Sequence, residues 1–550
     1  MKSQTHEFDV AVIGGGIAGS ATALQLLRGA RGCGCGKGGG CACGGLGRDL
    51  KVLVIERQET LGRRVGESTV ELSTYLLSRI LGLTRHLNEK HIVKQGFRYW
   101  FANDDAKDLG GCTEMGGRYL TRVASYQVDR AVLDAEVLRR VEEHGGEIWR
   151  PASVGRLELQ EGSTQTLTVK VGDQERVVKA RWVVDASGKQ AIVARQRGEV
   201  EPIEGHPIAA VWARWENTLD FDAPDTVERF PELGQNFFGT RHTATNHLMG
   251  DGWWAWVIPL KDGHTSVGVT WDERLFEWPR RRGGTLGDQL RAVLETHPTG
   301  RELLKDAKFV EGDVHIRRHL PYVAKTPMGD GFLLVGDAAG FIDPFYSMGL
   351  DSLAISSISG TAVILDERRG REVEPAIARH NDMFSKSLPR WFEGIYRDKY
   401  AYMGDYELMR VAFLVDIGLY YFGIIMPPYT RGRRTVADGM FAAPAAFPFY
   451  AFMRWVNRRL AAIAMVRRRR GTFGRRNAGR RMLIGGFSFD TAIPKAVFKA
   501  LWYMLWLELT DGWRSWRPRR GPDGSVVMPG DAQAAGKAVS GASASAASPV

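Results

Sequence analysis

The feature that most constrains the fold is a glycine-rich turn that directly follows an apolar run near the N-terminus. Residues 8–13 (FDVAVI) have the composition of a buried strand, and residues 14–19 (GGGIAG) match the pattern GxGxxG. Gly14 allows the tight turn, Gly16 lets a pyrophosphate approach the backbone, and Gly19 lets the following helix pack on the strand. The segment therefore predicts the first βαβ unit of a doubly wound, dinucleotide-binding α/β fold.

The second strand of this unit is predicted at residues 51–56 (KVLVIE). Glu56 ends that strand, where a carboxylate can accept hydrogen bonds from ribose hydroxyls. The usual gap of about 20 residues between fingerprint and carboxylate is exceeded, because a glycine- and cysteine-rich segment intervenes. We expect that segment to loop out and to leave Glu56 in place.

Four of the five cysteines lie in the intervening segment, at Cys33, Cys35, Cys41 and Cys43. Two CxC pairs can bind a soft metal, but the spacing differs from CxxC and no histidine lies nearby. We therefore predict no metal site and interpret the segment as a flexible surface insertion. Because no N-terminal secretory signal is visible, the cytosol is the default location, and its reducing chemistry disfavours disulfides.

Two further segments match the FAD elements of known oxidoreductases. Asp185 in DASG and Gly336-Asp337 in VGDAAG each follow a predicted buried strand. The set resembles the glutathione-reductase-like class of FAD enzymes with an aromatic-hydroxylase layout, which implies a Rossmann-like FAD-binding fold. The FAD-binding residues that this resemblance implies are Gly14, Gly16, Gly19, Glu56, Arg57, Gly66, Glu67, Ser68, Arg130, Asp185, Gly336 and Asp337.

The remaining patterns divide the chain into three regions. Residues 1–375 are predicted to form the FAD-binding domain, and short β-type runs at about 205–325 an inserted substrate sheet. Residues 376–520 are helical in character. The Ala-, Ser- and Gly-rich residues 521–550 are expected to be disordered.

The C-terminal region is also basic. Residues 401–520 hold 21 Lys and Arg against 7 Asp and Glu, an excess of 14, whereas the whole chain carries +11. This excess suggests an acidic partner or an anionic membrane surface, although the run 467–470 (RRRR) is interpreted as a solvated face. The apolar run 411–426 contains Asp416 and is shorter than the about 20 residues of a spanning helix, so a core or interfacial helix is predicted.

Three more motifs make the resemblance to a family specific. Residues 254–259 (WAWVIP) match WxWxIP, a pattern that alone would fit a packed aromatic strand. Residues 65–68 (VGES) resemble a loop over the flavin, and residues 341–349 (FIDPFYSMG) match FxxPxxSxG. With the FAD elements, these motifs resemble the flavin-dependent halogenase family, known also as tryptophan-halogenase-like FAD oxidoreductases.

The resemblance implies a catalytic lysine. Lys94 lies in KQGFRYWF, which is similar to the KxGxxF/W segment of halogenases that act on phenols and pyrroles. On one continuous strand, residues 94, 96 and 98 would share a face, so Arg98 is also a candidate for the cavity. We favour Lys94, because an amine can carry a halogen or donate to hypohalous acid, whereas a guanidinium stays protonated.

The reaction implied by the resemblance is FADH2-dependent halogenation. A chloride or bromide is held by backbone amides at Ser347, Met348 and Gly349, because a turn that opens a helix presents N–H groups to anions. FADH2 and O2 oxidise this halide to hypohalous acid, and Lys94 delivers the halogen to an electron-rich aromatic ring. The catalytic residues so implied are Lys94, Trp254, Trp256 and Ser347. The two tryptophans, with Pro259, are expected to screen the flavin from the substrate.

Three positions depart from the family pattern. Tyr346 stands where halogenases of free tryptophan carry a glutamate, which argues against free tryptophan as the substrate. Met348 replaces a small or hydroxylated residue beside the halide turn. Glu71 lies where many relatives have a proline after the flavin loop. A phenol- or pyrrole-type substrate is therefore predicted.

Four functions remain open from the sequence: halogenation of a phenolic or carrier-tethered aromatic, hydroxylation by an FAD monooxygenase, reduction of polyprenyl or polyene chains, and a flavin-binding scaffold without turnover. No second GxGxxG that would indicate a nicotinamide domain is visible, so we expect a separate flavin reductase to supply FADH2. An acyl carrier protein fits the basic C-terminal region, as does peripheral membrane contact by a cytoplasmic protein. No nucleic-acid partner is predicted. Secondary-metabolite or pigment biosynthesis is the expected context.

Overall fold

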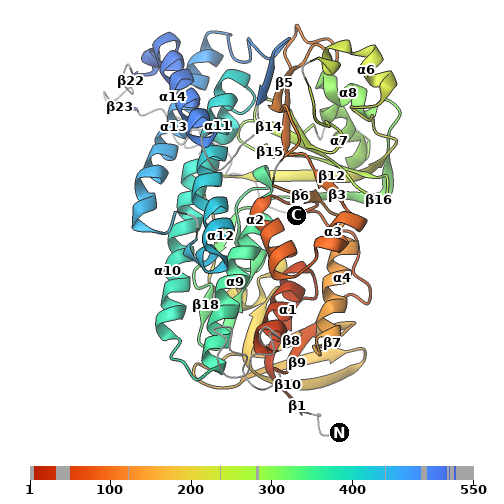
Figure 1. Ribbon diagram of the computed structural model, residues 1–550, viewed down its shortest axis with the longest axis vertical. Coiled ribbons are helices and arrows are strands. Elements are labelled where there is room, and N and C mark those ends of the chain that lie inside the picture. Colours follow the sequence, from red (N-terminus) through yellow and green to blue (C-terminus); the bar gives the residue numbers. More distant parts are fainter. Residues whose placement is uncertain are drawn as a thin grey trace, which may run out of the picture.

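The computed structural model describes residues 5–31, 50–121, 123–235, 237–279, 284–439, 441–484, 492–516, 519–520 and 526–527. The cysteine-rich segment, and with it the prediction of no metal there, lies outside the described residues, as does nearly all of the expected disordered tail. One sheet lies at the bottom of the molecule, a second sheet at the top, and long helices along one side (Figure 1).

The lower sheet contains the dinucleotide fingerprint. Its strands follow the order β18-β19-β10-β1-β2-β7, and the five strands from β19 to β7 are parallel. The hairpin of β8 and β9 pairs antiparallel with the first half of β10. The strands are β1 (Thr5–Ile13), β2 (Val52–Ile55), β7 (Glu147–Trp149), β8 (Ala152–Glu158), β9 (Gln165–Val171), β10 (Gln174–Asp185), β18 (Met328–Gly329) and β19 (Phe332–Leu334). The predicted α/β fold is confirmed.

Helix α1 (Ile17–Arg31) follows the fingerprint and packs between α4 (Arg130–Glu143) and α9 (Gly349–Arg368). Its buried residues include Ala21, Leu24 and Leu27, one face of a helix against the sheet. The side chain of Asp129 caps α4 by accepting hydrogen bonds from the backbone amides of its first turn. These helices fix the carboxyl ends of the parallel strands, which is where ligands bind in such folds.

The upper sheet has the order β16-β12-β15-β14-β13-β4-β5-β21. Its strands are β4 (Phe97–Phe101), β5 (Thr113–Gly117), β12 (Ile208–Glu216), β13 (Thr245–Met249), β14 (Trp253–Pro259), β15 (Thr265–Asp272), β16 (Lys308–Arg317) and β21 (Arg481–Ile484). Helices α6 (Pro224–Arg229), α7 (Leu286–Leu294) and α8 (Pro298–Leu304) lie at its outer end (Figure 1). The sheet therefore draws three strands from outside the segment 205–325.

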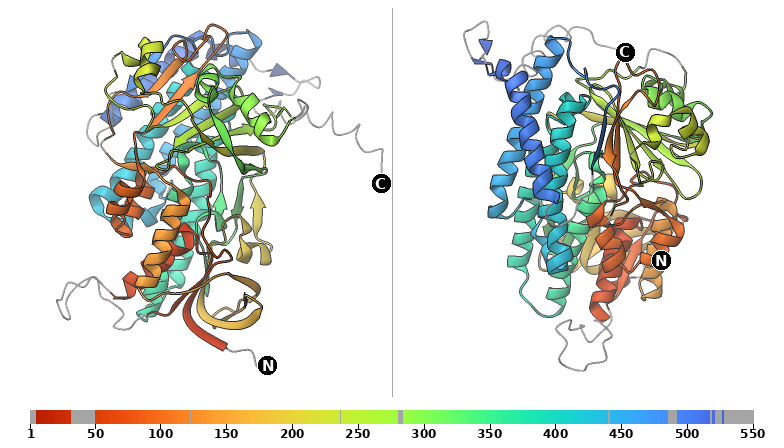
Figure 2. Two further views of the ribbon diagram at one scale, coloured as in Figure 1. Left: turned by 90° about the vertical axis from the view of Figure 1, so that its right-hand side faces the viewer. Right: turned by 45° about the horizontal axis from the view of Figure 1, so that its top comes forward.

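The long helices stand side by side and contact both sheet regions (Figure 2). They are α9, α10 (Glu374–Trp391), α11 (Tyr406–Tyr420), α13 (Phe447–Arg469) and α14 (Ala492–Thr510), and the short helix α12 (Met426–Arg431) lies between α11 and α13 in the chain. Two helical stretches, Phe345–Arg368 and Tyr406–Arg431, are long and apolar enough to cross a membrane by length and composition. Because 83% and 67% of their apolar windows are buried inside the protein, they pack as core helices do.

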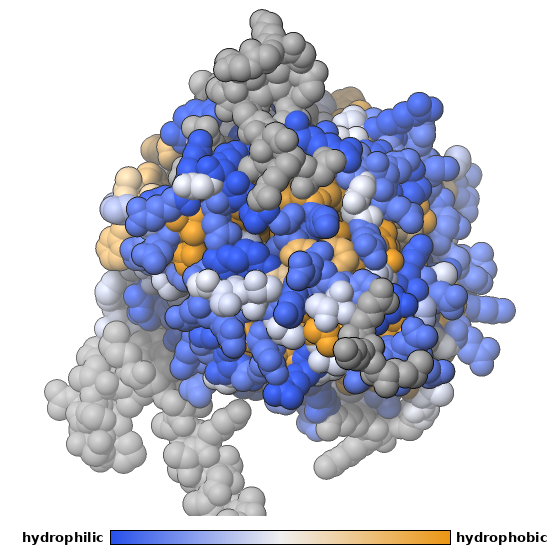
Figure 3. Space-filling model, turned by 90° about the horizontal axis from the view of Figure 1, so that it is seen from below, coloured by the Kyte–Doolittle hydropathy of each residue, from blue (hydrophilic) through white to orange (hydrophobic). Residues whose placement is uncertain are grey.

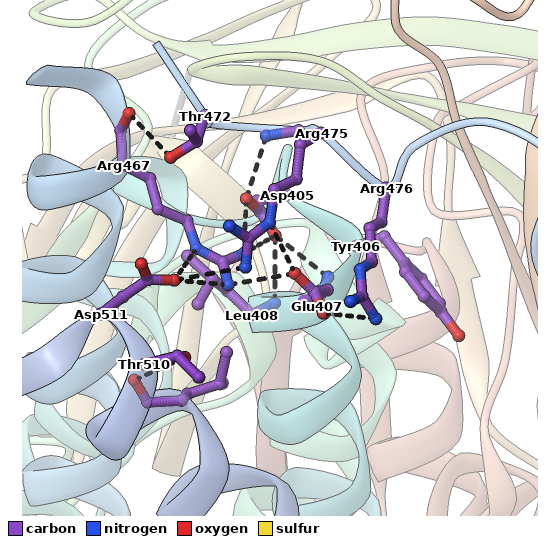
Figure 4. Close-up of polar contacts among 12 residues, drawn as sticks. Asp405, Tyr406, Glu407, Leu408, Arg467, Thr472, Arg475, Arg476, Thr510 and Asp511 are labelled. Carbon is purple, nitrogen blue, oxygen red and sulfur yellow. Dashed lines mark hydrogen bonds and ion pairs between the residues drawn. The ribbon is translucent and has the colours of Figure 1, made fainter. Parts of the chain in front are cut away.

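A buried ionic cluster joins the C-terminal helices, as Figure 4 shows. Arg467 is fully buried and pairs with Asp405 at 2.9 Å, with Glu407 at 3.0 Å and with Asp511 at 2.9 Å. Asp405 is also the N-cap of α11, whereas Arg467 belongs to α13 and Asp511 follows α14. The interpretation of residues 467–470 as a solvated charge run is therefore wrong at its first residue.

Smaller elements connect these layers. Short helices are α2 (Glu71–Thr74), α3 (Thr84–Lys90) and α5 (Ile192–Gln196), and β3 (Ile92–Lys94) pairs with β6 (Ser125–Gln127). Strands β11 (Val200–Pro202), β17 (Tyr322–Ala324) and β20 (Gly340–Phe341) form a small sheet. The remaining pair is β22 (Arg519–Arg520) and β23 (Val526–Val527). The face of the molecule seen from below is mostly hydrophilic, with smaller groups of hydrophobic residues between (Figure 3).

Candidate active site

Two cavities adjoin where the sheets and the helical side meet. The first, of about 450 Å³, is lined by the fingerprint, the loop around Ser68, β14 and the start of α9; we call it the dinucleotide cavity. The second, of about 330 Å³, is lined by β3, β4, α2 and α11; we call it the aromatic cavity. The turn before α9 contributes Ser347 and Gly349 to the first cavity and Tyr346 and Met348 to the second.

The fingerprint glycines differ in what surrounds them. Gly14 has φ +105°, and a Cβ there would lie 2.6 Å from the carbonyl oxygen of Ala186. A Cβ at Gly19 would lie 1.8 Å from the Gly14 oxygen, so helix and turn are in direct contact there. A Cβ added at Gly16 would have as its nearest neighbour the tip of the flexible Arg64 side chain, at 3.2 Å. The backbone at Gly16 is thus the part of the turn that a pyrophosphate can approach.

Glu56 lies at the end of β2, facing the same turn. One carboxylate oxygen accepts a hydrogen bond from the Gly15 amide at 2.7 Å, and the other accepts from the Gln58 amide at 2.8 Å. Each oxygen keeps a lone pair for a ribose hydroxyl. Arg57 and Arg64 line the cavity beside it.

The loop 65–68 lies between the dinucleotide cavity and α4. Gly66 has φ +98°, and Arg130 donates to the Val65 carbonyl at 3.2 Å while pairing with Asp134. Glu67 lines the cavity, but its carboxylate accepts hydrogen bonds from Arg214 at 2.6 and 3.1 Å. The side chain of Glu67 is therefore engaged in holding the loop.

Two aspartates follow strands at the edge of the cavity. Asp337 lines it together with Gly336, and burial raises the pKa of Asp337. Asp185, expected to bind FAD, is instead fully buried and accepts hydrogen bonds from the amides of Ser187 at 3.0 Å and Val193 at 2.8 Å. Its carboxylate shapes the turn, and the neighbouring Ala186, Ser187 and Gly188 line the cavity in its place.

Strand β14 presents alternate side chains to two different cores. Trp254, Trp256 and Ile258 line the dinucleotide cavity. Trp253, Ala255 and Val257 pack in the separate core of the upper sheet. The indole N–H of Trp254 donates to the Tyr400 hydroxyl at 2.9 Å, and that of Trp256 to the Ser266 hydroxyl at 3.2 Å. Both rings are thus held in fixed orientations.

The turn before α9 has an unusual backbone. Tyr346 and Ser347 have φ of +68° and +59°, a left-handed region that residues with a side chain rarely occupy. The Ser347 amide donates to the Pro344 carbonyl at 3.1 Å, so it is already engaged. Helix α9 begins at Gly349 without a side-chain cap. The first amides of α9 are the remaining N–H groups that can attract an anion here.

Lys94 ends β3 and is buried, with 1% of its surface exposed. Its ammonium lines the aromatic cavity, donates to the Ser68 hydroxyl at 2.8 Å and the Thr69 carbonyl at 2.9 Å, and lies 3.8 Å from the centre of the Phe97 ring. Burial lowers the pKa of Lys94 to about 7, and the negative charges of Glu71 and Asp351 oppose that shift. Because Ser68 lines the dinucleotide cavity, Lys94 connects the two cavities.

Arg98 is not a second candidate at this position. The expected continuous strand is interrupted, since β3 ends at Lys94, Gly96 has φ +72° and β4 begins at Phe97. Arg98 is buried, pairs with Glu114 and donates to the Gly117 carbonyl at 2.8 Å, and its own side chain is not among those that line the aromatic cavity. The argument that residues 94 and 98 share a face is therefore wrong, because it assumed one strand.

Several lining residues were not predicted as parts of a site. Helix α11 supplies Phe413, Asp416 and Tyr420 to the aromatic cavity, and the π-helical turn after it supplies Tyr421. His247 on β13 lines the dinucleotide cavity and stacks on Tyr99, with ring centres 4.8 Å apart. Burial lowers the pKa of His247 to about 3, with a further contribution from the charge of Lys94, so this imidazole is neutral. The only sequence signal for α11 was the polar Asp416 inside an apolar run.

The side chains of the dinucleotide cavity fit FAD. The open backbone at Gly16 and the cationic Arg57, Arg64 and Arg130 suit a diphosphate, Glu56 suits a ribose, and the tryptophans of β14 suit a flat ring system. Among the described residues, no three His, Cys, Asp or Glu side chains are grouped as a metal site would require.

Comparison with known proteins agrees with this geometry. A family model described as tryptophan halogenase matches residues 114–393, just over half of the chain. The 1H-pyrrole-2-carbonyl-[peptidyl-carrier protein] chlorinase of Pseudomonas fluorescens is 25% identical over 422 residues, which cover 72% of this chain and 81% of that protein. The sulochrin halogenase gedL of Aspergillus terreus is 24% identical over 415 residues, covering 71% and 69%.

Solved structures share the fold. The crystal structure of halogenase PltM superposes with a TM-score of 0.67 at 17% identity, covering 90% of this chain and 97% of that one. The flavin-dependent brominase Bmp2 gives a TM-score of 0.59 at 18% identity, with coverage of 82% and 98%. The chain belongs to the tryptophan halogenase family and is a flavin-dependent halogenase.

Proposed function

We propose that this protein halogenates an electron-rich phenolic or carrier-tethered aromatic ring, and that Lys94 delivers the halogen. The observation that carries the proposal is the position of Lys94. Its ammonium bonds to Ser68, a residue of the dinucleotide cavity, yet lines the aromatic cavity. An amine with a pKa of about 7 is substantially neutral at physiological pH and can act as a nucleophile.

The residues divide the reaction between the two cavities. Bound FADH2 supplies the activation of O2 that oxidises chloride or bromide to hypohalous acid. The halide lies at the amides that begin α9, next to Ser347 and Gly349. The Lys94 amine attacks the halogen of hypohalous acid, an N–X bond forms, the O–X bond breaks, and the hydroxide leaves as water with a proton from the nitrogen.

The wall between the cavities keeps the flavin away from the ring to be modified. Trp254 and Trp256 lie on the dinucleotide side, and Tyr346 and Met348 on the aromatic side. Direct transfer of oxygen to the substrate requires the ring to reach the flavin, which this wall opposes. The arrangement therefore favours halogenation over hydroxylation.

The relatives support the substrate class. One acts on a carrier-bound pyrrole and another on sulochrin, and halogenase PltM has been crystallised with phloroglucinol and FAD. Tyr346 occupies the position of the glutamate expected in halogenases of free tryptophan. A phenol or pyrrole, free or held by an acyl carrier protein in a secondary-metabolite or pigment pathway, is the substrate we assign. A separate flavin reductase supplies FADH2.

A peripheral membrane contact is the second part of the proposal. The outer face of α14 exposes large apolar side chains at helical spacing, namely Phe498, Leu501, Trp502, Leu505 and Leu509. We call this set the α14 stripe. Lys495, Lys499 and Arg514 lie along the same segment, whereas Glu508 and Asp511 are paired with Arg459 and Arg467. An apolar stripe with unbalanced positive charge fits an anionic membrane surface on the cytoplasmic side.

The halogenation proposal is tested with purified protein, a flavin reductase, NADH, FAD and phloroglucinol in the presence of chloride or bromide. Mass spectrometry should show the chlorine or bromine isotope pattern in the product. Hydroxylated phloroglucinol without halogen would overturn halogenation in favour of the monooxygenase reaction.

A further inference from the structure

Two carboxylates face an aromatic cavity that is otherwise mainly apolar. Its walls are aromatic and aliphatic, yet Glu71 at the start of α2 and Asp416 in the middle of α11 both line it. Lys94 is the one cationic side chain among the described residues that line this cavity. A buried carboxylate is costly unless it is paired, so two of them in such a wall call for an explanation.

Glu71 is only partly satisfied by the protein. One oxygen accepts a hydrogen bond from the Tyr421 hydroxyl, and the carboxylate also accepts one from its own backbone amide. No ion pair within 4 Å joins Glu71 to Lys94, although the two charges interact across the cavity. Burial raises the pKa of Glu71, and the hydrogen bond from Tyr421 opposes the rise. A carboxylate can accept about four hydrogen bonds, so Glu71 keeps acceptor capacity for a ligand in the cavity that it lines.

Asp416 has its partners on one oxygen. That oxygen accepts from the Tyr346 hydroxyl at 3.0 Å and from the Lys399 ammonium at 2.6 Å. Lys399 is buried and does not line the cavity. The second oxygen of Asp416 keeps its capacity to accept, so it is a second acceptor on the cavity wall.

Three tyrosine hydroxyls of the cavity wall already donate to carboxylates of the protein. Tyr346 donates to Asp416, Tyr421 donates to Glu71, and Tyr420 donates to Asp351 at 2.8 Å. The charged groups that line the cavity are therefore two carboxylates and the Lys94 amine, beside the neutral polar side chains of Gln95, Tyr119, Thr121 and Ser125. An anionic substrate would face two carboxylates and one buried lysine, which opposes its entry electrostatically.

We infer that Glu71 and Asp416 select a neutral aromatic that carries at least two hydroxyl or ring N–H donors, and that Glu71 accepts the proton of the donor nearest Lys94. The inference deepens the proposed function and rests on it. As the ring carbon takes the halogen, the N–X bond breaks and the C–X bond forms, while the donor proton passes to Glu71. The ring carbon then releases its proton to the Lys94 nitrogen, which restores the amine, and Glu71 returns its proton to the substrate oxygen.

The first test uses the natural protein and a graded set of probes. Phloroglucinol is compared with its monomethyl, dimethyl and trimethyl ethers, which keep an electron-rich ring but lose one, two or three donors. We expect kcat/KM to fall by about tenfold or more once fewer than two donors remain, because a carboxylate of the wall is then left without a partner. Equal rates across the series would overturn the inference.

The second test is the near-isosteric change Glu71→Gln, with Tyr421→Phe as its matched control. Glu71→Gln should lower kcat/KM on phloroglucinol by about tenfold or more and flatten the dependence on donor number, because it removes the negative charge and replaces one carboxylate oxygen with an NH2 donor. Tyr421→Phe keeps the carboxylate and should retain the donor dependence. A Glu71→Gln protein with the natural donor dependence would contradict the assignment.

Hypohalous acid, trapped with a halogen acceptor in solution, is measured in the same reactions. If the natural protein makes no hypohalous acid, the proposed function itself fails. If hypohalous acid forms but no member of the phenol series is halogenated, the proposed function stands and the substrate class inferred from the two carboxylates is wrong.

Discussion

At the scale of a residue, the sequence alone could not decide whether Lys94 or Arg98 faces the aromatic cavity. The motif KQGFRYWF indicated Lys94. Arg98 was also a candidate, because residues 94 and 98 would share a face if the strand were continuous. Gly96 has a positive φ and interrupts the strand, and the Arg98 side chain pairs with Glu114. A one-residue break in a strand is decided by sheet pairing, since β3 pairs with β6 and β4 with β13, and such long-range pairing leaves no local pattern.

The pKa of Lys94 makes a prediction about pH. Below about pH 7 the buried ammonium predominates, and above it the neutral amine does. Halogen transfer from externally supplied hypohalous acid, expressed relative to that of Lys94→Ala at the same pH so that ionisation of the acid cancels, should therefore rise with pH through an apparent pKa near 7 and then level off. The measurement is single-turnover halogenation of phloroglucinol between pH 5.5 and 8.5. A rate that falls over this range would show that Lys94 acts as the ammonium and not as the amine.

At the scale of elements, the strands were more predictable than the walls of the site. The motif WxWxIP indicated that Trp254, Trp256 and Pro259 lie beside the flavin; the two tryptophans line the dinucleotide cavity, whereas Pro259 is not among its lining residues. Helix α11 was predicted as a core helix, yet nothing in the run 411–426 indicated that it closes the aromatic cavity. The wall depends on how α11, which lies more than 300 residues after Lys94 in the chain, packs against β4. The local spacing of apolar residues does not indicate a contact between segments so far apart.

The α14 stripe gives a prediction at this scale. Trp502 and Leu505 are 64% and 52% exposed, so replacing either with Glu should leave the fold intact. Each buried large side chain contributes about 1.5–3 kcal/mol, so either change should weaken partition onto vesicles containing anionic lipid by about tenfold or more. Vesicle sedimentation measures this partition. Phe238→Glu is the matched control, since Phe238 is 63% exposed on another element. Equal partition of all variants would remove the stripe from membrane contact.

At the scale of the whole molecule, composition described the charge of the C-terminal region but not where the charge lies. The excess of 14 cationic residues includes Arg467, which is buried among three carboxylates that join α11, α13 and the end of α14 (Figure 4). Sequence alone could predict the α/β fold and the FAD elements, because fingerprint and strand share a local pattern. It could not separate buried from solvated arginines, because their partners lie at distant positions.

This cluster predicts a difference between two neighbouring arginines. Arg467→Ala removes the buried cation of the cluster and leaves buried Asp405 without an ion pair among the described residues, whereas Arg470, Arg475 and Arg476 still pair with Glu407 or Asp511. We expect the free energy of unfolding to fall by about 3–5 kcal/mol. Arg468→Ala removes an ion pair with Asp251 at the surface, where the cost is about 0–1 kcal/mol. Thermal unfolding followed by fluorescence compares the two. Similar Tm values for both variants would show that the cluster does not hold the helices together.

The central claim is that the halogen passes from the dinucleotide cavity through Lys94 to the ring. The most direct measurement is a pair of readouts on Lys94→Ala, with reductase, bromide and phloroglucinol present: oxidation of FADH2, and brominated product by mass spectrometry. We predict that flavin oxidation continues while brominated phloroglucinol disappears. Brominated product at the rate of the natural protein would contradict the account and remove Lys94 from the reaction.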